Sequence, residues 1–466
     1  MSLAPKRAVL WRRQVEDTAV LGLVDGAAWV GALVGGDLLA SLFFGGRVSL
    51  QYSLLMIPLW WIGAGVIRLY PGWGTGVVEE VRRQELMLVA SFGLASLVSF
   101  LTRMGSRASF LFAFLVAAIL FPLARQAAKS LLIRAGAWGV PAVIHGDEAS
   151  AASIVRALRA EPGLGYVPVG VVTGEASAPV RAVEGVPVLD SAIAGHPPAP
   201  VALLASAQMG GAAVMEYVEH RLREFPTVVL VPELADAPSL WVKPRDLQGI
   251  LGLEISDNLK DPWARAMKRA MDYALVVASA PLWAPLALLL AATVALVDRG
   301  WPFYTQERMG HGGRAFRAVK FRTMVPRAEE ALRGELERNP SLRGEWEQDF
   351  KVRNDPRITP LGRVLRRFSL DELPQFLNVL AGQMSLVGPR PLPTYHHAAL
   401  PERERRLRER ALPGVTGLWQ VSGRSDSGTA GMTRWDSYYV RNWSVWLDLV
   451  ILARTVAAVV SGRGAY

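Results

Sequence analysis

The sequence predicts a membrane protein in three parts. These are a four-helix transmembrane bundle at residues 1–135, a Rossmann-like α/β cytoplasmic domain at 136–255, and a third domain at 256–466 that holds a re-entrant membrane helix. Apolar residues make up 51% of the 466 positions, and they concentrate before residue 135 and between 271 and 297. Strand and helix patterns alternate in the middle part. The absence of cysteine excludes disulfides and cysteine metal sites. The net charge of +10 fits nucleic acid, anionic lipid or phosphate-bearing substrates, and composition alone does not choose between them.

Four apolar segments open the chain, and each is close to the ~20 residues that a helix needs to cross a bilayer. They cover residues 19–44, 52–70, 86–101 and 110–133. Lysine and arginine precede the first segment, separate the second from the third, and close the fourth. By the positive-inside rule, the N-terminus and everything after residue 135 face the cytoplasm. No small-residue cleavage site follows the first segment, so a signal peptide is the weaker interpretation.

Residues 140–250 alternate between short apolar runs and helical patterns, which predicts an α/β domain with a parallel sheet. The expected strands are VPAVIHG, YVPVGVV, VALLASA and TVVLVPE, with helices at DEASAASIVRALRA and AVMEYVEHRLREF. The first strand-to-helix turn, His145 to Glu148, lacks two glycines of the dinucleotide pattern G-x-G-x-x-G, and its acidic side chains would repel phosphate. A scaffolding or oligomerisation role is therefore favoured over nucleotide binding.

The segment from Met271 to Asp298 is apolar enough for a fifth transmembrane helix. However, Pro281 and Pro285 lie inside it, and an internal proline costs ~3 kcal/mol or kinks the helix. Basic residues flank the segment on both sides, so the charge bias does not favour a crossing. A helix that breaks at Ala280 and Pro281 and leaves the membrane on its entry side satisfies both observations.

The last part of the chain contains three further helical patterns. In TPLGRVLRRF, Thr359 is the expected N-cap and Pro360 the first helical residue. The apolar run at 443–460 is interrupted by Asp448 and Arg454, so a core-packed or interfacial helix is favoured over a membrane span. The charge run ERERRLRER at 402–410 is most simply a solvated helix.

Two short motifs suggest phosphate chemistry. In FRAVKFRTM, strand alternation places Lys320 and Arg322 on one face, where two cations suit a phosphate, although an ordinary edge strand fits equally well. In SLDEL, Ser369 and Glu372 have the spacing of a capping box. Alternatively, Asp371 attacks phosphorus while Glu372 holds a divalent cation. A helix N-terminus would keep both carboxylates ionised.

A longer run of motifs favours the second interpretation. The stretches KVRNDPRITPLGRVLRRFSLDELPQFLNVLAGQMSLVGPRPLP, PGVTGLWQVSGRS and WDSYYVRNWSVWLDLVILARTV follow KFRTM and the proline-broken apolar segment. In this order they resemble the successive signatures of the bacterial sugar transferase family, the monotopic phosphoglycosyl transferases. The whole chain is similar to the large members, and it looks closest to the undecaprenyl-phosphate galactose phosphotransferases. Members often carry Ser-Pro at the membrane break, whereas this chain has Ala280-Pro281 with Ser279 one place earlier.

The resemblance implies transfer of a hexose 1-phosphate, most closely galactose 1-phosphate, from a UDP-sugar to undecaprenyl phosphate, with release of UMP. This would be the first membrane step of O-antigen, capsule or exopolysaccharide synthesis. Asp371 matches the nucleophile that forms a phosphosugar-aspartyl intermediate, and Glu372 matches the Mg²⁺ ligand. The resemblance also implies a substrate-binding set: Lys320, Arg366, Pro389 and Arg390, with Arg322, Arg424 and Asp436 as motif members near the site. It implies a homodimer in the bacterial inner membrane, with the catalytic domain on the cytoplasmic face and no nucleic-acid partner.

Three alternatives stay open at this point. The same chemistry with UDP-glucose is excluded by no motif. A membrane-anchored nucleotide-sugar dehydratase or epimerase would need a Tyr-x-x-x-Lys pair, and no tyrosine in the chain is followed four residues later by lysine. A non-enzymatic membrane scaffold would use the acidic pair only as a helix cap.

Overall fold

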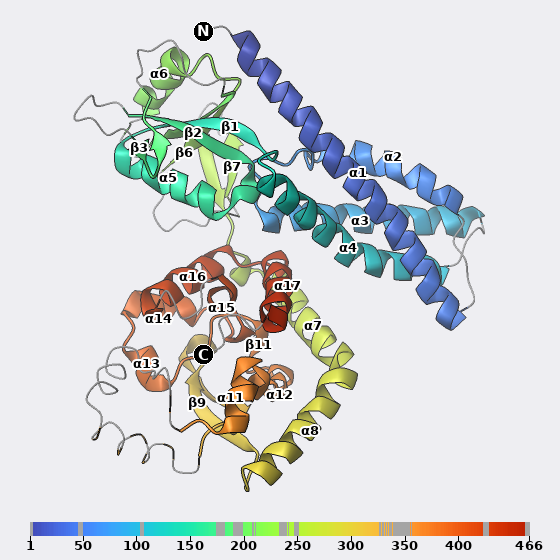
Figure 1. The fold of residues 1–466 in the computed structure, drawn as a ribbon, viewed down its shortest axis with the longest axis vertical. Helices are drawn as coiled ribbons and strands as arrows, with labels where there is room; N and C mark the ends of the chain where they lie inside the picture. Colours follow the sequence, from blue (N-terminus) through green and yellow to red (C-terminus); the bar gives the residue numbers. More distant parts are fainter. Residues whose placement is uncertain are drawn as a thin grey trace. The chain divides into compact units, whose positions relative to one another are not determined.

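The computed structural model divides into two compact units, Met1–Ala235 and Asp236–Tyr466 (Figure 1). It describes residues 3–44, 50–102, 107–173, 182–189, 199–206, 211–232, 242–246, 251–325, 357–422 and 428–461, with a few single residues between these ranges.

Four helices open the first unit, in the places where the sequence predicts membrane spans. They are α1 (Leu3–Phe44), α2 (Leu50–Val66), α3 (Val77–Thr102) and α4 (Arg107–Arg134). Together they bury an apolar cluster that contains the rings of Trp29 and Trp60. Most of α1 and α4 is long and apolar enough to cross a membrane, whereas the described apolar part of α2 is shorter, Met56–Val66. In α3, charged residues between Glu79 and Glu85 precede the apolar stretch.

A buried ion-pair cluster joins α1, α3 and α4. Arg125 lies 2.9 Å from Asp25 and 3.0 Å from Glu80, and Lys129 lies 2.7 Å from Glu80. All four residues are more than nine-tenths buried. Breaking such a buried pair costs ~3–5 kcal/mol, so the cluster fixes how these three helices pack.

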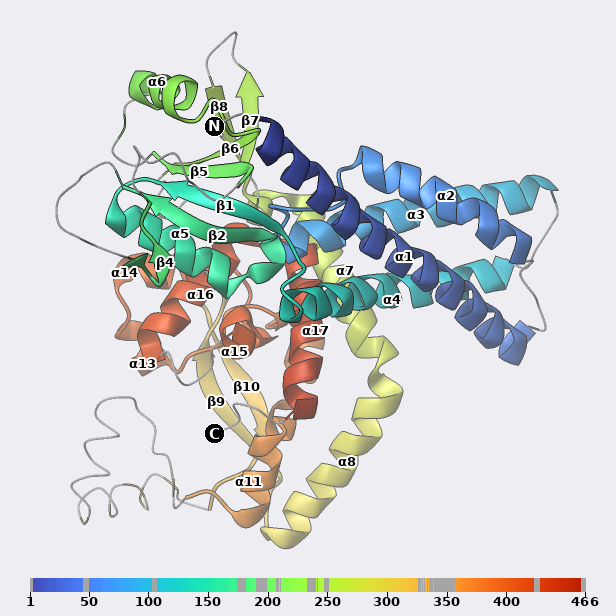
Figure 2. The ribbon, with the colours of Figure 1, turned by 45° about the horizontal axis from the view of Figure 1, so that its top comes forward.

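The predicted parallel sheet follows, with the strand order β2-β1-β5-β6. Its strands are β1 (Val140–His145), β2 (Tyr166–Val172), β5 (Val201–Ala205) and β6 (Thr227–Val231), and the accompanying elements are α5 (Glu148–Ala160), α6 (Gly211–Arg221) and the hairpin of β3 (Ala182–Val183) with β4 (Val186–Pro187). Helix α5 lies along the sheet (Figure 2) and buries Val155 against it. Asp147 caps α5 by accepting a hydrogen bond from Ser150 N at 3.0 Å. A carboxylate therefore occupies the helix N-terminus where a dinucleotide site would bind phosphate.

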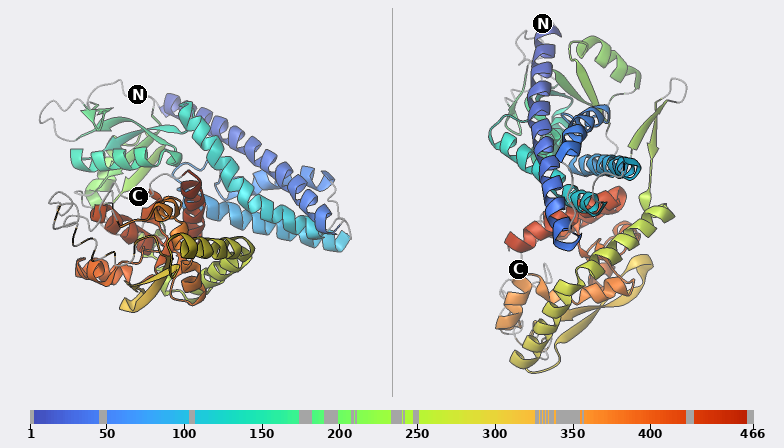
Figure 3. Two further views of the ribbon diagram at one scale, coloured as in Figure 1. Left: turned by 60° about the horizontal axis from the view of Figure 1, so that its bottom comes forward. Right: turned by 90° about the vertical axis from the view of Figure 1, so that its right-hand side faces the viewer.

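The second unit begins with a hairpin and a broken helix. These elements are β7 (Val242–Asp246), β8 (Leu251–Ile255), α7 (Pro262–Ala278) and α8 (Ala280–Val297). The predicted boundary at residue 255 lies after the hairpin, and the boundary between the compact units lies before it. The two helices meet at Ser279 and run along one side of the unit (Figure 3). Ser279 Oγ donates to Leu275 O at 2.6 Å and Trp283 Nε1 to Val276 O at 2.9 Å. Side chains thus cover carbonyls at the break.

The rest of the second unit packs against the end of α8. In chain order its described elements are β9 (Phe303–Met309), β10 (Ala315–Phe321), α11 (Pro360–Arg367), the 3₁₀ turn η4 (Leu370–Glu372), α12 (Gln375–Leu380), β11 (Ser385–Val387), α13 (Thr394–Ala398), α14 (Glu402–Arg408), β12 (Gly414–Thr416), α15 (Leu418–Ser422), α16 (Gly428–Asn442) and α17 (Val445–Ser461). Strands β9 and β10 are antiparallel, and β11 pairs with β12 in parallel. The predicted cap of α11 is confirmed, because Thr359 Oγ1 accepts from Gly362 N at 2.9 Å. Helix α17 is core-packed, with Asp448 fully buried.

Two local interpretations are wrong. Ser369 has a left-handed backbone with φ of 54° and makes no side-chain capping bond, so no capping box forms. The acidic pair lies in the turn η4, and α12 begins only at Gln375. The charge run at 402–410 is not simply solvated, because Arg408 is buried in an ion pair with Asp436. That pair forms between α14 and α16, a tertiary contact that the charge pattern does not reveal.

Candidate active site

The adjacent carboxylates of η4 are buried beside two cations from distant parts of the chain. Asp371 is 8% exposed and Glu372 is 9% exposed. Lys320 Nζ lies 2.6 Å from Glu372 Oε1, and Arg390 Nη2 lies 2.7 Å from the same oxygen. Charge-assisted hydrogen bonds of this length are about twice as strong as neutral ones. Glu372 is therefore held firmly, while Asp371 beside it forms no ion pair in the described part of the chain.

Lys320 reaches the acidic pair because α12 is bonded to its strand. Asn378 of α12 accepts from Val319 N at 3.0 Å and donates to Arg317 O at 2.8 Å. One buried amide thus satisfies strand groups on both sides of Ala318. Apolar side chains of α8, β10 and α11 pack together in a cluster that contains Phe321. This cluster holds the end of β10 that carries Lys320.

Arg390 projects from the Gly-Pro-Arg-Pro turn, whose main chain is bonded to β12. Gly388 N donates to Thr416 O at 2.9 Å, and Gly414 N donates to Pro389 O at 3.0 Å. A Cβ on Gly388 would lie 2.2 Å from Leu412 O, so only glycine allows this close approach.

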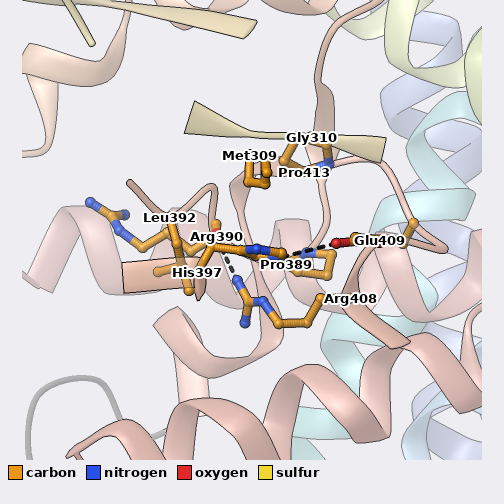
Figure 4. Close-up of a pocket in the computed structure, with 10 residues that line it drawn as sticks. Met309, Gly310, Pro389, Arg390, Leu392, His397, Arg408, Glu409 and Pro413 are labelled. Carbon is orange, nitrogen blue, oxygen red and sulfur yellow. Dashed lines mark hydrogen bonds and ion pairs between the residues drawn. The ribbon is translucent and has the colours of Figure 1, made fainter. Parts of the chain in front are cut away.

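A second, buried ion pair supports the same turn. Arg408 Nη2 donates to Arg390 O at 2.6 Å, and Figure 4 shows Arg408 pointing toward the main chain of Arg390. Asp436 is buried and pairs with Arg408. Asp436 therefore acts on the site through Arg408. Among the described contacts, none joins Asp436 directly to the acidic pair or to its two cations.

The two carboxylates have opposite pKa shifts. Burial alone would raise the pKa of Glu372, but Arg390 and Lys320 outweigh burial and lower that pKa to about 2. Burial, together with the negative charge of Glu372, raises the pKa of Asp371, and Lys320, Arg366 and Arg390 only partly oppose it. Divergent pKa values in one buried pair are typical of sites where two acids have different tasks.

The other predicted residues lie in different places. Arg366 on α11 donates from Nε to Thr323 Oγ1 at 3.0 Å, and its charge acts on Asp371. Arg322 instead donates from Nη2 to Asp298 O at 2.9 Å, just after the C-terminus of α8. Arg424 lies outside the described residues. Ala280 and Pro281 open α8 at the helix break.

Pattern reasoning missed a buried network beneath the Arg390 turn. Lys268 Nζ lies 2.6 Å from Asp448 Oδ2 and 3.1 Å from Val387 O. Tyr439 OH donates to the same Val387 carbonyl at 3.0 Å, and Asp272 Oδ1 accepts from Leu386 N at 3.2 Å. The network links α7, α16 and α17 to the strand that leads into Gly388. The available signal was Asp448, one of two charges inside a largely apolar helix.

Two pockets share Arg390 in their lining. One lies at Glu372 and is lined by Arg308, Lys320, Glu372, Gln375, Arg390 and Pro391, among others. The other lies next to His397 and Glu409, which are 3.5 Å apart (Figure 4). Arg390 is thus shared by a strongly cationic pocket and one where a histidine faces a carboxylate.

The acidic pair fits a magnesium ion only if substrate supplies further ligands. No group of three acidic or histidine side chains that could hold a metal occurs within the described ranges. Glu372 Oε1 is taken by both cations, whereas Oε2 has one long contact, 3.5 Å to Arg390 Nη1. Mg²⁺ is commonly held by one or two carboxylates plus substrate phosphates and water. Glu372 Oε2 is the atom suited to this role.

Comparison with known proteins agrees with the site. Residues 263–462 match the family model described as bacterial sugar transferase. The UDP-galactose-lipid carrier transferase of Erwinia amylovora is 34% identical over 378 residues, which cover 78% of this chain and 76% of that protein. The chain belongs to the bacterial sugar transferase family. Its match begins in α7 and ends just after α17, so the family region holds every predicted site residue.

Two more relatives in the family are named for the sugar phosphate that they transfer. The undecaprenyl-phosphate galactose phosphotransferase of Salmonella typhimurium is 35% identical over 410 residues, 84% of this chain and 82% of that protein. The UDP-glucose:undecaprenyl-phosphate glucose-1-phosphate transferase of Escherichia coli is 31% identical over 337 residues, 69% of this chain and 68% of that protein. These alignments are longer than the family match and extend into the N-terminal unit.

Proposed function

We propose that this protein transfers a hexose 1-phosphate from a UDP-sugar to undecaprenyl phosphate and releases UMP. The observation that carries the proposal is the acidic pair, in which Glu372 is bound by two cations and Asp371 is left with a raised pKa and no ion-pair partner in the described part of the chain. Family membership and the names of the long-aligned relatives support the reaction class.

The first step uses Asp371 as the nucleophile. A carboxylate oxygen of Asp371 forms a bond to the β-phosphorus, the bond between that phosphorus and the bridging oxygen breaks, and UMP leaves with the electron pair. Lys320 and Arg390 lie where they would neutralise the phosphate oxygens as negative charge shifts. Arg366 keeps Asp371 more readily ionised, because its positive charge opposes the effect of burial.

The second step returns Asp371 to its free form. An oxygen of undecaprenyl phosphate attacks the phosphorus of the aspartyl adduct, and the Asp371 oxygen leaves, which gives undecaprenyl-diphosphate-sugar. Splitting the transfer into two displacements lets one cationic pocket serve both substrates. Magnesium held by Glu372 Oε2 would supply further neutralisation of the phosphate charge.

Galactose is the sugar that we propose first, with glucose as the second candidate. The two longest alignments described above are with proteins named for galactose, and a shorter one is with a protein named for glucose. The test incubates membranes that contain the protein with undecaprenyl phosphate and each UDP-sugar separately. UMP release with UDP-galactose and little with UDP-glucose supports the proposal, and the opposite preference assigns glucose. No UMP release from any UDP-sugar would refute the reaction class.

We also propose that α7 and α8 form a re-entrant element, with the catalytic unit on the cytoplasmic face of the inner membrane, α1–α4 as four membrane spans, and a homodimeric assembly. Both ends of the element are bound to the same compact unit. Arg269 near the start bonds Met384 O at 2.8 Å, while Val294 near the end packs on Phe321. The chain has no cysteine, so exposed Trp263 and Trp301 can each be replaced by a single reporter cysteine. Labelling of both from one side supports re-entry, and labelling from opposite sides refutes it.

A further inference from the structure

Arg308 is a further cation in the pocket at Glu372. None of the sequence motifs singled out this residue. It lies on β9, where Tyr304 is paired with Lys320 of β10. Side chains at every second position share one face of a strand, so Arg308 and Lys320 lie on the same face of the hairpin. Both line the pocket that contains Glu372 and Arg390.

Only neutral groups hold the guanidinium of Arg308. Nη1 donates to Pro391 O at 3.0 Å, Nη2 donates to the side-chain oxygen of Gln306, and Nε is buried without a hydrogen-bond partner. In the described part of the chain, no carboxylate forms an ion pair with Arg308. Burial and the positive charge of Arg390 lower the pKa of Arg308 to about 10. Its charge is thus poorly compensated in the free protein.

The pocket as a whole carries surplus positive charge. Among the residues that line it, the single carboxylate of Glu372 faces three cations, Arg308, Lys320 and Arg390. The surplus of two positive charges matches the two negative charges of a nucleoside diphosphate sugar at neutral pH. An anion that compensates a partly buried cation recovers the free energy which that cation costs in the unbound state.

The position of Arg308 indicates which phosphate it binds. Arg308 donates to Pro391 O at 3.0 Å, directly after Arg390 in the turn. The pocket that Arg308 lines with Glu372 and Arg390 does not have Asp371 in its lining, so Arg308 lies one step further from the nucleophile. The attacked phosphorus must adjoin Asp371, and the next phosphate is one bridging oxygen away.

We propose that Arg308 binds the donor phosphate that leaves with UMP, an inference that rests on the proposed function. When the bridging bond breaks, the electron pair stays on this phosphate and its negative charge rises by one. A guanidinium at this position stabilises the transition state more than the bound substrate. Arg308 would therefore serve the first displacement and not the second.

The test compares Arg308→Gln and Arg308→Lys with Arg317→Gln, a control at an exposed residue whose side chain lies on the opposite face of β10. Full-length protein in nanodiscs is mixed with UDP-galactose without acceptor, and UMP release is followed in a single turnover. Undecaprenyl phosphate is then added to the isolated adduct to time the second step. UMP affinity is measured separately by calorimetry, and thermal unfolding checks that each variant is folded.

We expect Arg308→Gln to slow UMP release by about 100-fold or more and to weaken UMP binding, with the second step nearly unchanged and partial recovery in Arg308→Lys. Unchanged UMP release and UMP affinity in Arg308→Gln would overturn the inference, as would equal slowing of both steps. If the wild type turns over no UDP-sugar but loses UMP affinity on Arg308→Gln, the proposed function fails and the phosphate assignment stands.

Discussion

Replacing Glu372 with Gln keeps the shape of the buried side chain and removes its charge. The lowering of its pKa from 4.5 to about 2 corresponds to about 3 kcal/mol of folding stability at ~1.36 kcal/mol per unit. Because the pKa is lowered in the folded state, this stability is fully present above pH 4.5 and is lost as the pH falls toward 2. At neutral pH the variant should lack all of it, since Lys320 and Arg390 would then lose their ion-pair partner.

The assay is thermal unfolding of the catalytic unit in detergent across pH. For a unit of this size, a loss of about 3 kcal/mol lowers the midpoint by ~6–12 °C. The wild type should lose stability between pH 4.5 and 2, and the variant should lack this component. Glu307→Gln is the matched control, because Glu307 is exposed on the same hairpin and surface changes stay within about 0.5 kcal/mol. A midpoint for Glu372→Gln within 2 °C of the control would refute the argument that Glu372 anchors both cations.

Three further predictions follow from the same contacts. Asp371→Asn should abolish sugar-phosphate transfer yet raise the unfolding midpoint at pH 7, since burial and Glu372 disfavour the ionised form; retained transfer would exclude Asp371 as nucleophile. Arg366→Gln should move the acid limb of the rate profile to higher pH, because a charge that lowers the pKa of Asp371 is lost; the exposed Arg363→Gln serves as control, and an identical profile for both contradicts the role. Lys268→Met should lower unfolding stability by ~3–5 kcal/mol and raise KM, whereas adding Asp448→Asn should restore much of the stability; simple additivity of the two losses would show that the pair is not coupled.

Much of the architecture was readable from the sequence, because it depends on local periodicity. The alternation between 140 and 250 correctly predicted a parallel sheet, and Thr359-Pro360 correctly placed the start of α11. Proline fixed the helix break to within a residue, since it removes a backbone donor wherever it stands. The acidic pair and the Gly-Pro-Arg-Pro turn were assigned to the site through the order of motifs over the last 200 residues. The local chemistry of each motif alone would not have supported that assignment.

The sequence by itself thus determined the family, the helical and α/β regions, and the candidate acids. Tertiary structure decided which charges meet. It pairs Lys320 with Glu372, turns Arg322 toward Asp298 and adds Arg308 to the pocket from a neighbouring strand. It also places the acids in a 3₁₀ turn and not at a helix N-terminus. The physical reason is that ion pairs and buried networks join residues tens of positions apart. Their energies depend on burial and distance, which strand register and helix packing set and which no local pattern encodes.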